Sequence, residues 1–173
     1  MYDTYLDPNA GLFGMQEGAK PLHIMYDPVY RNVRIANCYD RKINKVRMWV
    51  RYYQMSGYEV ELAGKYVQLP AQSCDEYFTF NSAFKFLTKD EGLFLSVGIT
   101  DSFDNLIDEN FYWLPDAKGE YSGLQELPKA GVSVTARLLD KGKAEVVITN
   151  PPGNPVAFFN RTSVPKVNRK NFL

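Results

Sequence analysis

Short segments in which apolar and polar residues alternate constrain the fold of this chain more than any other feature of its sequence. The clearest alternation covers residues 46–53. Its even-numbered positions are apolar or aromatic, namely Val46, Met48, Val50 and Tyr52. Its odd-numbered positions are Arg47, Trp49, Arg51 and Tyr53. Successive side chains of a β-strand point to opposite faces, so this pattern predicts a strand with a different surface on each side.

Six further segments between residues 22 and 114 have the composition or alternation of strands. They cover residues around 23–26 and 33–36, and residues 58–69, 74–80, 93–100 and 106–114. The alternation slips at Ala63-Gly64, which predicts a bulge or bend. About seven short strands in roughly 90 residues, with no long helix between them, predict an all-β fold built on an antiparallel β-sandwich of the immunoglobulin type.

A short helix is predicted before these strands. Asp7 can accept hydrogen bonds from the free N–H groups at a helix start, and Pro8 needs no such bond at the first helical position. Phe13 follows at helical spacing and Gly18 marks the end. We therefore predict that residues 1–21 form a terminal segment with a helix, and that residues 22–115 form the sandwich.

The remaining residues, 116–173, begin with a linker-like stretch rich in turn-forming residues. Three strand candidates follow, at residues 132–139, 144–149 and 156–161. Three strands cannot close a sandwich that needs about seven. We expect a partial second β domain whose small sheet needs covering by other parts of a protein.

Composition excludes several classes of function. The 20 Lys and Arg residues balance the 20 Asp and Glu residues, so the formal net charge is zero. This balance argues against nucleic acid and anionic lipid as partners. No apolar stretch reaches the roughly 20 residues that span a bilayer. Met1 is not followed by a typical secretory signal, so we expect either a protein that stays where it is made or a piece of a longer chain.

The residues that usually carry metal or cofactor chemistry are scarce. The chain has one histidine, His23, and two cysteines, Cys38 and Cys74. These numbers rule out a multi-histidine or four-cysteine metal site, and no glycine-rich phosphate loop is present, so we expect no metal and no cofactor. His23 is interpreted as a structural residue near a domain junction. A Cys38–Cys74 bridge is conceivable, but isolated cysteines are more often small buried hydrophobes.

Acidic residues gather in two short runs beside predicted turns. They are Asp90 and Glu91, and Asp101, Asp104, Asp108 and Glu109. A glycosidase needs two carboxyl groups facing each other across a cleft. Carboxylates beside a turn are normally solvated loop charges, and we interpret both runs in this way. The sequence therefore provides no catalytic residue.

The odd-numbered face of residues 46–53 is the most informative predicted surface. Aromatic rings alternating with guanidinium groups are unusual for a surface that only meets water. Three interpretations are open: an interface with another domain, a core position for Trp49, and contact with carbohydrate. On the second interpretation the opposite face of the strand would be outside.

Four sequence patches together resemble a known family. They are YLDPNAGLFG at residues 5–14, KPLHI at 20–24, NFYWL at 110–114, and YSGL at 121–124 followed by Leu127-Pro128. In the same order, these patches resemble the region after the catalytic barrel in glycoside hydrolase family 2, in the branch of exo-β-glucosaminidases and β-mannosidases. The resemblance implies that residues 1–21 end a missing (β/α)8 barrel and that two immunoglobulin-like domains follow, the second truncated.

The resemblance also implies a role. The acid/base and nucleophile glutamates of this family lie in the barrel, and no position of this chain matches their motifs. We therefore expect a non-catalytic accessory region that supports the barrel of a parent enzyme. That parent would hydrolyse terminal β-mannosides or β-glucosaminides, and a periplasmic or extracellular location is favoured for it. The alternatives are a carbohydrate-binding module and a protein-interaction domain.

Overall fold

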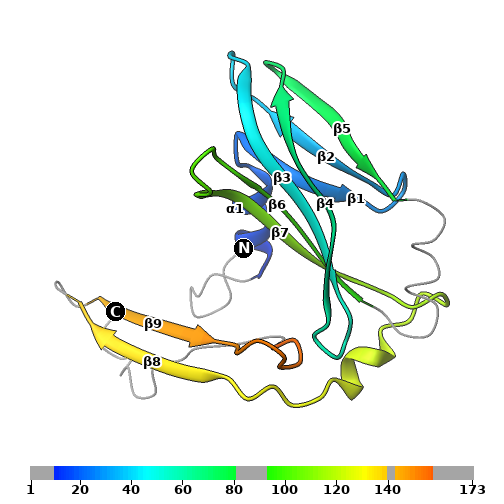
Figure 1. Cartoon of the computed structure of the whole chain (residues 1–173), viewed down its shortest axis with the longest axis vertical. Helices are drawn as coiled ribbons and strands as arrows, with labels where there is room; N and C mark the ends of the chain where they lie inside the picture. The colour runs from blue at the N-terminus through cyan, green and yellow to red at the C-terminus, as the bar shows by residue number, and fades with distance from the viewer. Residues whose placement is uncertain (1–9, 81–92, 140–142, 158–173) are drawn as a thin grey trace, which may run out of the picture.

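The computed structural model describes residues 10–80, 93–139 and 143–157, and it consists mainly of antiparallel β-strands (Figure 1). One helix, α1 (Ala10–Gly18), precedes the strands. Its bounds agree with the predicted helix end at Gly18, while the predicted start at Asp7-Pro8 lies outside the described residues. The chain turns from α1 directly into β1 (Leu22–Asp27).

Seven strands, β1 to β7, form the predicted sandwich. The others are β2 (Asn32–Asn37), β3 (Ile43–Tyr53), β4 (Glu59–Leu69), β5 (Ser73–Thr79), β6 (Leu93–Thr100) and β7 (Leu106–Leu114). They pair into a three-stranded sheet of order β1-β2-β5 and a four-stranded sheet of order β4-β3-β6-β7. All pairs are antiparallel. The all-β immunoglobulin-like sandwich predicted from the strand pattern is therefore confirmed.

The core lies between the two sheets. The three-stranded sheet contributes Ile24, Val33 and Ile35, and the four-stranded sheet contributes most of the rest, including Met48, Val50, Leu95, Val97 and Ile99. All eight residues of β6 are buried. This strand lies between β3 and β7, so its edges are paired, and side chains cover both of its faces. That burial explains why β6 is apolar along most of its length without a clear alternation.

The pairing of β3 with β4 contains the predicted irregularity. Val50 pairs with Ala63, and the next residue, Arg51, pairs with Glu61, so Leu62 is the extra residue of a bulge. Bulges bend and twist a strand locally. Ala63-Gly64, where the sequence alternation slips, is adjacent to this bulge.

A separate two-stranded sheet follows the sandwich. A short 3-10 helix, η1 (Ser122–Glu126), leads to β8 (Ser133–Leu138) and β9 (Ala144–Thr149), which pair as an antiparallel hairpin away from the core of the sandwich (Figure 1). Val134, Leu138 and Val146 are exposed on one face of the hairpin, and Val147 is exposed on the other. The third strand predicted in this region does not begin at Val156 or Ala157, and residues 158–161 lie outside the described part of the chain.

One expectation about the cysteines is wrong. Cys38 and Cys74 are both free and exposed instead of buried. Cys74 pairs with Ala36 across β2 and β5, so Cys38 and Cys74 are diagonal rather than directly opposite. Cys74 lies in β5 and Cys38 directly follows β2, and both residues are exposed in the described part of the chain.

Candidate functional site

The odd-numbered residues of β3 from Arg47 to Tyr53 lie on the face of the four-stranded sheet that is turned away from the sandwich core. We call this face the outer face. Its members on β3 are Arg47, Trp49, Arg51 and Tyr53, and none of them belongs to the core cluster. Their cross-strand partners on β6 are Thr100, Gly98, Ser96 and Phe94. The alternation of β3 in the sequence therefore corresponds to a real division between a core face and an outer face.

Trp49 is buried on the outer face. Only 6% of its surface is exposed, although it lies outside the core between the sheets. Gly98 is its partner on β6, and a Cβ atom at Gly98 would lie 2.2 Å from Cζ2 of the indole. The missing side chain lets the ring lie flat against the sheet. The Arg51 guanidinium carbon covers it, 4.6 Å from the ring centre.

The two arginines of the outer face are paired with carboxylates of β4. Arg47 Nη2 lies 3.0 Å from Glu61 Oε1, and Arg51 Nη2 lies 3.0 Å from Glu61 Oε2. The Nε atom of Arg51 also lies 3.4 Å from Glu59 Oε1. Burial opposes the charge of Arg51, but the hydrogen bond to Glu61 and the nearby carboxylates raise its pKa above the ordinary value. Both guanidinium groups are thus occupied within the sheet.

An aromatic groove lies at the end of the outer face where the β3–β4 turn meets the segment after β9. Its volume is about 1060 Å³. The sandwich contributes Tyr53, Ser56, Gly57, Tyr58, Glu59, Phe111 and Trp113 to its lining. The other wall consists of Ile148, Asn150 to Asn154, Val156 and Ala157. This size is at the upper end of ordinary small-molecule sites.

Three exposed rings give the groove its chemical character. Tyr58 is 63% exposed, Phe111 is 45% exposed and Trp113 is 42% exposed. Phe111 stacks on the fully buried Phe94, with ring centres 5.3 Å apart and planes inclined by 24°. The buried ring supports the exposed one, so Phe111 presents a fixed aromatic surface.

Glu59 alone is charged among the described residues that line the groove. Burial, together with the carboxylate of Glu59, raises the pKa of the neighbouring Tyr53 hydroxyl. Tyr53 therefore stays protonated and neutral in the groove at ordinary pH. The local charge is that of one carboxylate beside several neutral rings, hydroxyls and amides.

A close backbone contact joins the two walls. Gly57 has φ +90°, and a Cβ atom there would lie 2.2 Å from the backbone oxygen of Asn154. The side chain of Asn154 donates to the carbonyl oxygen of Gly131 at 2.8 Å and to Oδ1 of Asn150 at 2.9 Å. These bonds hold the wall after β9 in shape against the β3–β4 turn.

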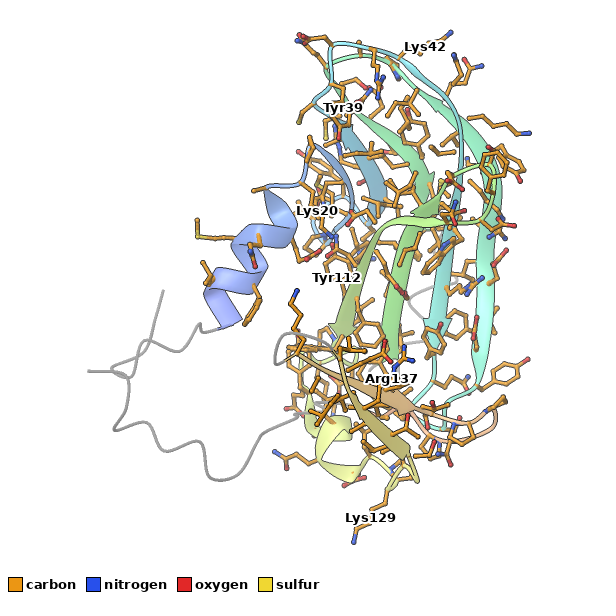
Figure 2. All side chains as sticks on the ribbon, turned by 90° about the vertical axis from the view of Figure 1, so that its left-hand side faces the viewer. Lys20, Tyr39, Lys42, Tyr112, Lys129 and Arg137 are labelled. Carbon is orange, nitrogen blue, oxygen red and sulfur yellow. The ribbon has the colours of Figure 1, made fainter. Side chains whose placement is uncertain are left out.

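A second polar cluster fastens the start of β1 to β7. Asp108 is fully buried, and its carboxylate accepts hydrogen bonds from Lys20 Nζ at 2.8 Å and from the backbone N–H of Ile24 at 2.9 Å. His23 Nδ1 lies 3.0 Å from the same carboxylate, without the alignment of a hydrogen bond. Figure 2 shows Lys20 between α1 and the strands.

Two further residues of β7 complete this cluster. The amide of Asn110 donates to the carbonyl oxygen of Ile24 and lies 3.3 Å from His23 Nε2. The hydroxyl of Tyr112 accepts the backbone N–H of Tyr26 at 3.1 Å. Each contact satisfies a backbone or side-chain group of β1, so the arrangement fits the structural interpretation of His23.

The expectation that Asp108 is a solvated loop charge is therefore wrong. Asp101 and Asp104 lie in the turn before β7 as expected, and Asp101 accepts bonds from backbone N–H groups within that turn. Asp108 instead lies where β7 passes beneath β1, and Lys20 and the N–H of Ile24 compensate its burial. Asp90 and Glu91 lie outside the described residues.

The described residues contain no group of three or more His, Cys, Asp or Glu side chains that could hold a metal ion. No helix in the described part of the chain is long and apolar enough to cross a membrane.

Sequence reasoning missed the groove because its walls come from distant segments. Phe111 and Trp113 alternate in β7, and that alternation could have indicated a shared face with the odd-numbered residues of β3. Nothing in the sequence indicated that the proline-rich segment after β9 would lie opposite the Ser56-Gly57 turn.

The closing part of the chain is similar to a known family. Residues 110–173 match the family model described as the exo-β-D-glucosaminidase Ig-fold domain. No curated protein matches the sequence.

Solved structures resemble most of the chain. The exo-chitosanase CsxA of Amycolatopsis orientalis superimposes with a TM-score of 0.67 and 21% identity, over 86% of this chain and 20% of that enzyme. A variant of CsxA in complex with PNP-β-D-glucosamine gives a TM-score of 0.67 and 22% identity, over 88% of this chain and 20% of that one. The chain thus spans about one fifth of the length of these enzymes.

These findings confirm the predicted resemblance to the immunoglobulin-like region of a family 2 glycoside hydrolase. The family model covers residues 110–173, and the superposition shows that the fold is shared over most of the chain.

Proposed function

We propose, on the premise that this is the immunoglobulin-like region of an exo-glucosaminidase-like glycoside hydrolase, that the chain braces the catalytic barrel of a longer enzyme. The parent reaction is retaining hydrolysis of a terminal β-linked glucosamine, with mannose as the alternative sugar. The catalytic carboxylates belong to the barrel, and residues 1–21 connect that barrel to the sandwich at residues 22–115. Residues 116–173 belong to the next domain.

The observation that carries this proposal is the buried cluster around Asp108. Its hydrogen bonds join Lys20, just before β1, and the backbone of Ile24 in β1 to Asp108 in β7, a strand of the four-stranded sheet. A segment that led from another domain by a loose linker would not need a fully buried carboxylate at its junction. A rigid junction is consistent with a supporting role, because it fixes the orientation of the sandwich relative to the segment that precedes it.

The apolar residues of α1 support the same interpretation. Phe13 and Met15 are both more than half exposed on this helix. Large apolar side chains gathered on one exposed element are typical of an interaction surface. A barrel packed against one side of α1 would cover at least one of these two side chains.

An enzyme assay and a stability measurement test the proposal together. The 173-residue chain should give no turnover of aryl β-glucosaminides or aryl β-mannosides. In the longer coding sequence, deletion of this region should lower the melting temperature and activity of the barrel. Turnover by the 173-residue chain would contradict the proposal, and so would a barrel that keeps full stability and activity without the region.

A specific observation also favours the carbohydrate-binding alternative. The groove beside the outer face has exposed rings suited to stacking on sugar, and it lies apart from the junction around Asp108. Supporting a barrel and binding a sugar are therefore compatible roles for different surfaces of the chain.

A further inference from the structure

We propose that the aromatic groove is a binding subsite for a cationic amino sugar in an oligosaccharide. The groove is lined by Tyr58, Phe111 and Trp113, and it contains the carboxylate of Glu59. This assignment differs from the sugar contact predicted from the sequence, because Trp49 is covered by Arg51 and cannot offer its ring to a ligand.

The aromatic rings supply the stacking surfaces. The face of a pyranose ring is lined with C–H groups that carry partial positive charge, and the face of an aromatic ring is negative. Phe111 is held by its stack on Phe94, and Tyr58 presents most of its surface to solvent. A volume of about 1060 Å³ is large enough for more than one sugar ring.

The carboxylate of Glu59 makes the groove selective for a positively charged sugar. Arg51 makes its hydrogen bond to Glu61 at 3.0 Å, while its Nε lies 3.4 Å from Glu59. The nearest cation is therefore held mainly by Glu61, and Glu59 is left with acceptor capacity on the groove side. Because the described lining contains no lysine or arginine, a sugar ammonium is attracted and a uronic acid is repelled.

The polar wall offers neutral partners for hydroxyl groups. Asn150 and Asn154 lie along it, and their mutual hydrogen bond and the bonds to Pro155 and Gly131 keep the amides in place. Pre-organised amides beside exposed rings lose little conformational entropy when a ligand binds.

The inference rests on the proposed function in one respect, which is the choice of sugar. The related CsxA structure contains PNP-β-D-glucosamine, so β-linked glucosamine oligomers are the natural probe. The groove itself is argued from its own rings and charge.

The experiment is a calorimetric and NMR titration of the 173-residue chain with a glucosamine trimer. An N-acetylglucosamine trimer and cellotriose serve as neutral probes with similar rings. We expect saturable binding of the glucosamine trimer, with chemical-shift changes confined to the groove, and weaker binding of the neutral trimers. We expect added salt to weaken only the binding of the charged trimer.

Variants assign the binding to the groove. Phe111→Ala and Tyr58→Ala should each weaken the glucosamine trimer about three- to tenfold, the usual value of an aromatic contact. Glu59→Gln should weaken it about two- to fivefold, as for an exposed ion pair, and should leave the neutral trimers unaffected. Tyr66→Ala is the matched control, because Tyr66 is an exposed aromatic residue of β4 that lies outside the groove.

Three results would overturn the inference. They are a titration without saturation, equal binding of charged and neutral trimers, and binding that the three groove variants leave unchanged. None of these results affects the barrel-deletion measurement, so the subsite can fail while the proposed supporting role stands. Loss of the supporting role would likewise leave a measured trimer affinity intact.

Discussion

The indole of Trp49 lies flat against Gly98, its cross-strand neighbour, at a position where a single added carbon would come within 2.2 Å of the ring. This relationship explains how a tryptophan can be buried on the outer face of a sheet. The glycine provides the space below the ring, and Arg51 provides the cover above it. The indole is thereby removed from solvent without entering the core between the sheets.

Gly98→Ala tests that packing. The new methyl group meets the rigid ring, so either the indole or β6 must shift. We expect a loss of about 1–3 kcal/mol in the free energy of unfolding, the usual cost of overpacking. Urea denaturation followed by tryptophan fluorescence measures it. Gly14→Ala is the control, since a Cβ atom at Gly14 has no atom within 4 Å and should cause no such loss. Equal stability of the two variants would contradict the prediction.

Gly57→Ala tests the contact between the walls of the groove. A Cβ atom there would meet the backbone of Asn154, and the residue has φ +90°. We expect the segment after β9 to separate from the β3–β4 turn, with faster amide exchange in residues 150–155. Gly119→Ala separates the effect of the steric contact with Asn154 from the effect of placing alanine at a positive φ. Gly119 has a similar φ of +84° but has no atom within 4 Å of its Cβ position, so it should leave exchange in residues 150–155 unchanged.

Asp108→Asn tests the junction between α1 and the sandwich. The variant keeps an oxygen for the N–H of Ile24 but loses the negative charge that faces Lys20. We expect a loss of about 1–3 kcal/mol in the free energy of unfolding, the range for a disturbed buried polar group. Thermal denaturation measures the loss. Asp104→Asn, in the preceding exposed turn, should be close to neutral, and an equal effect of both variants would count against the buried cluster.

The stability of this junction should also depend on pH. The hydrogen bond to Asp108, followed by that to Glu17, raises the pKa of Lys20 above 10.5. A raised lysine pKa contributes stability that is fully present below the unfolded pKa and is lost as pH rises through the folded pKa. The stability difference between the wild type and Lys20→Met should therefore be constant at neutral pH and should decrease above about pH 10. A difference that grows with pH would contradict this sign.

The two thiols should react independently of unfolding. Cys38 and Cys74 are both free and exposed, so a thiol reagent such as Ellman's reagent should modify both in the native chain. The stoichiometry should be the same with and without denaturant. Modification of fewer than two thiols before denaturation would show that one of them is buried or that the two form a bridge.

The sequence predicted the strands of the sandwich well because their signal is local. In β3 the odd and even positions differ in chemistry, and a strand converts that difference directly into two faces. Even the bulge in β4 was detectable, because an extra residue interrupts the same alternation. The helix end at Gly18 was also local, since it depends on backbone freedom at one position.

The candidate site was harder to predict because its properties depend on what packs nearby. Asp108 has the same local sequence signature as a turn carboxylate, but β1 covers it. Trp49 could be a core residue, an interface residue or a ligand contact until its neighbour on β6 is known. The exposure of Cys38 and Cys74 depends on which face of the three-stranded sheet they share with Ala36, which only the pairing of β2 with β5 shows.

By itself, the sequence determined which segments form the strands of the sandwich and which side chains of β3 share a face. Tertiary structure alone decided that Gly98 makes room for Trp49, that β1 buries Asp108, and that Phe111 and the segment after β9 enclose one groove. The physical reason is the range of each effect. Alternation acts between neighbouring residues of one strand, whereas burial, charge pairing and groove formation depend on residues that the chain brings together only after it has folded.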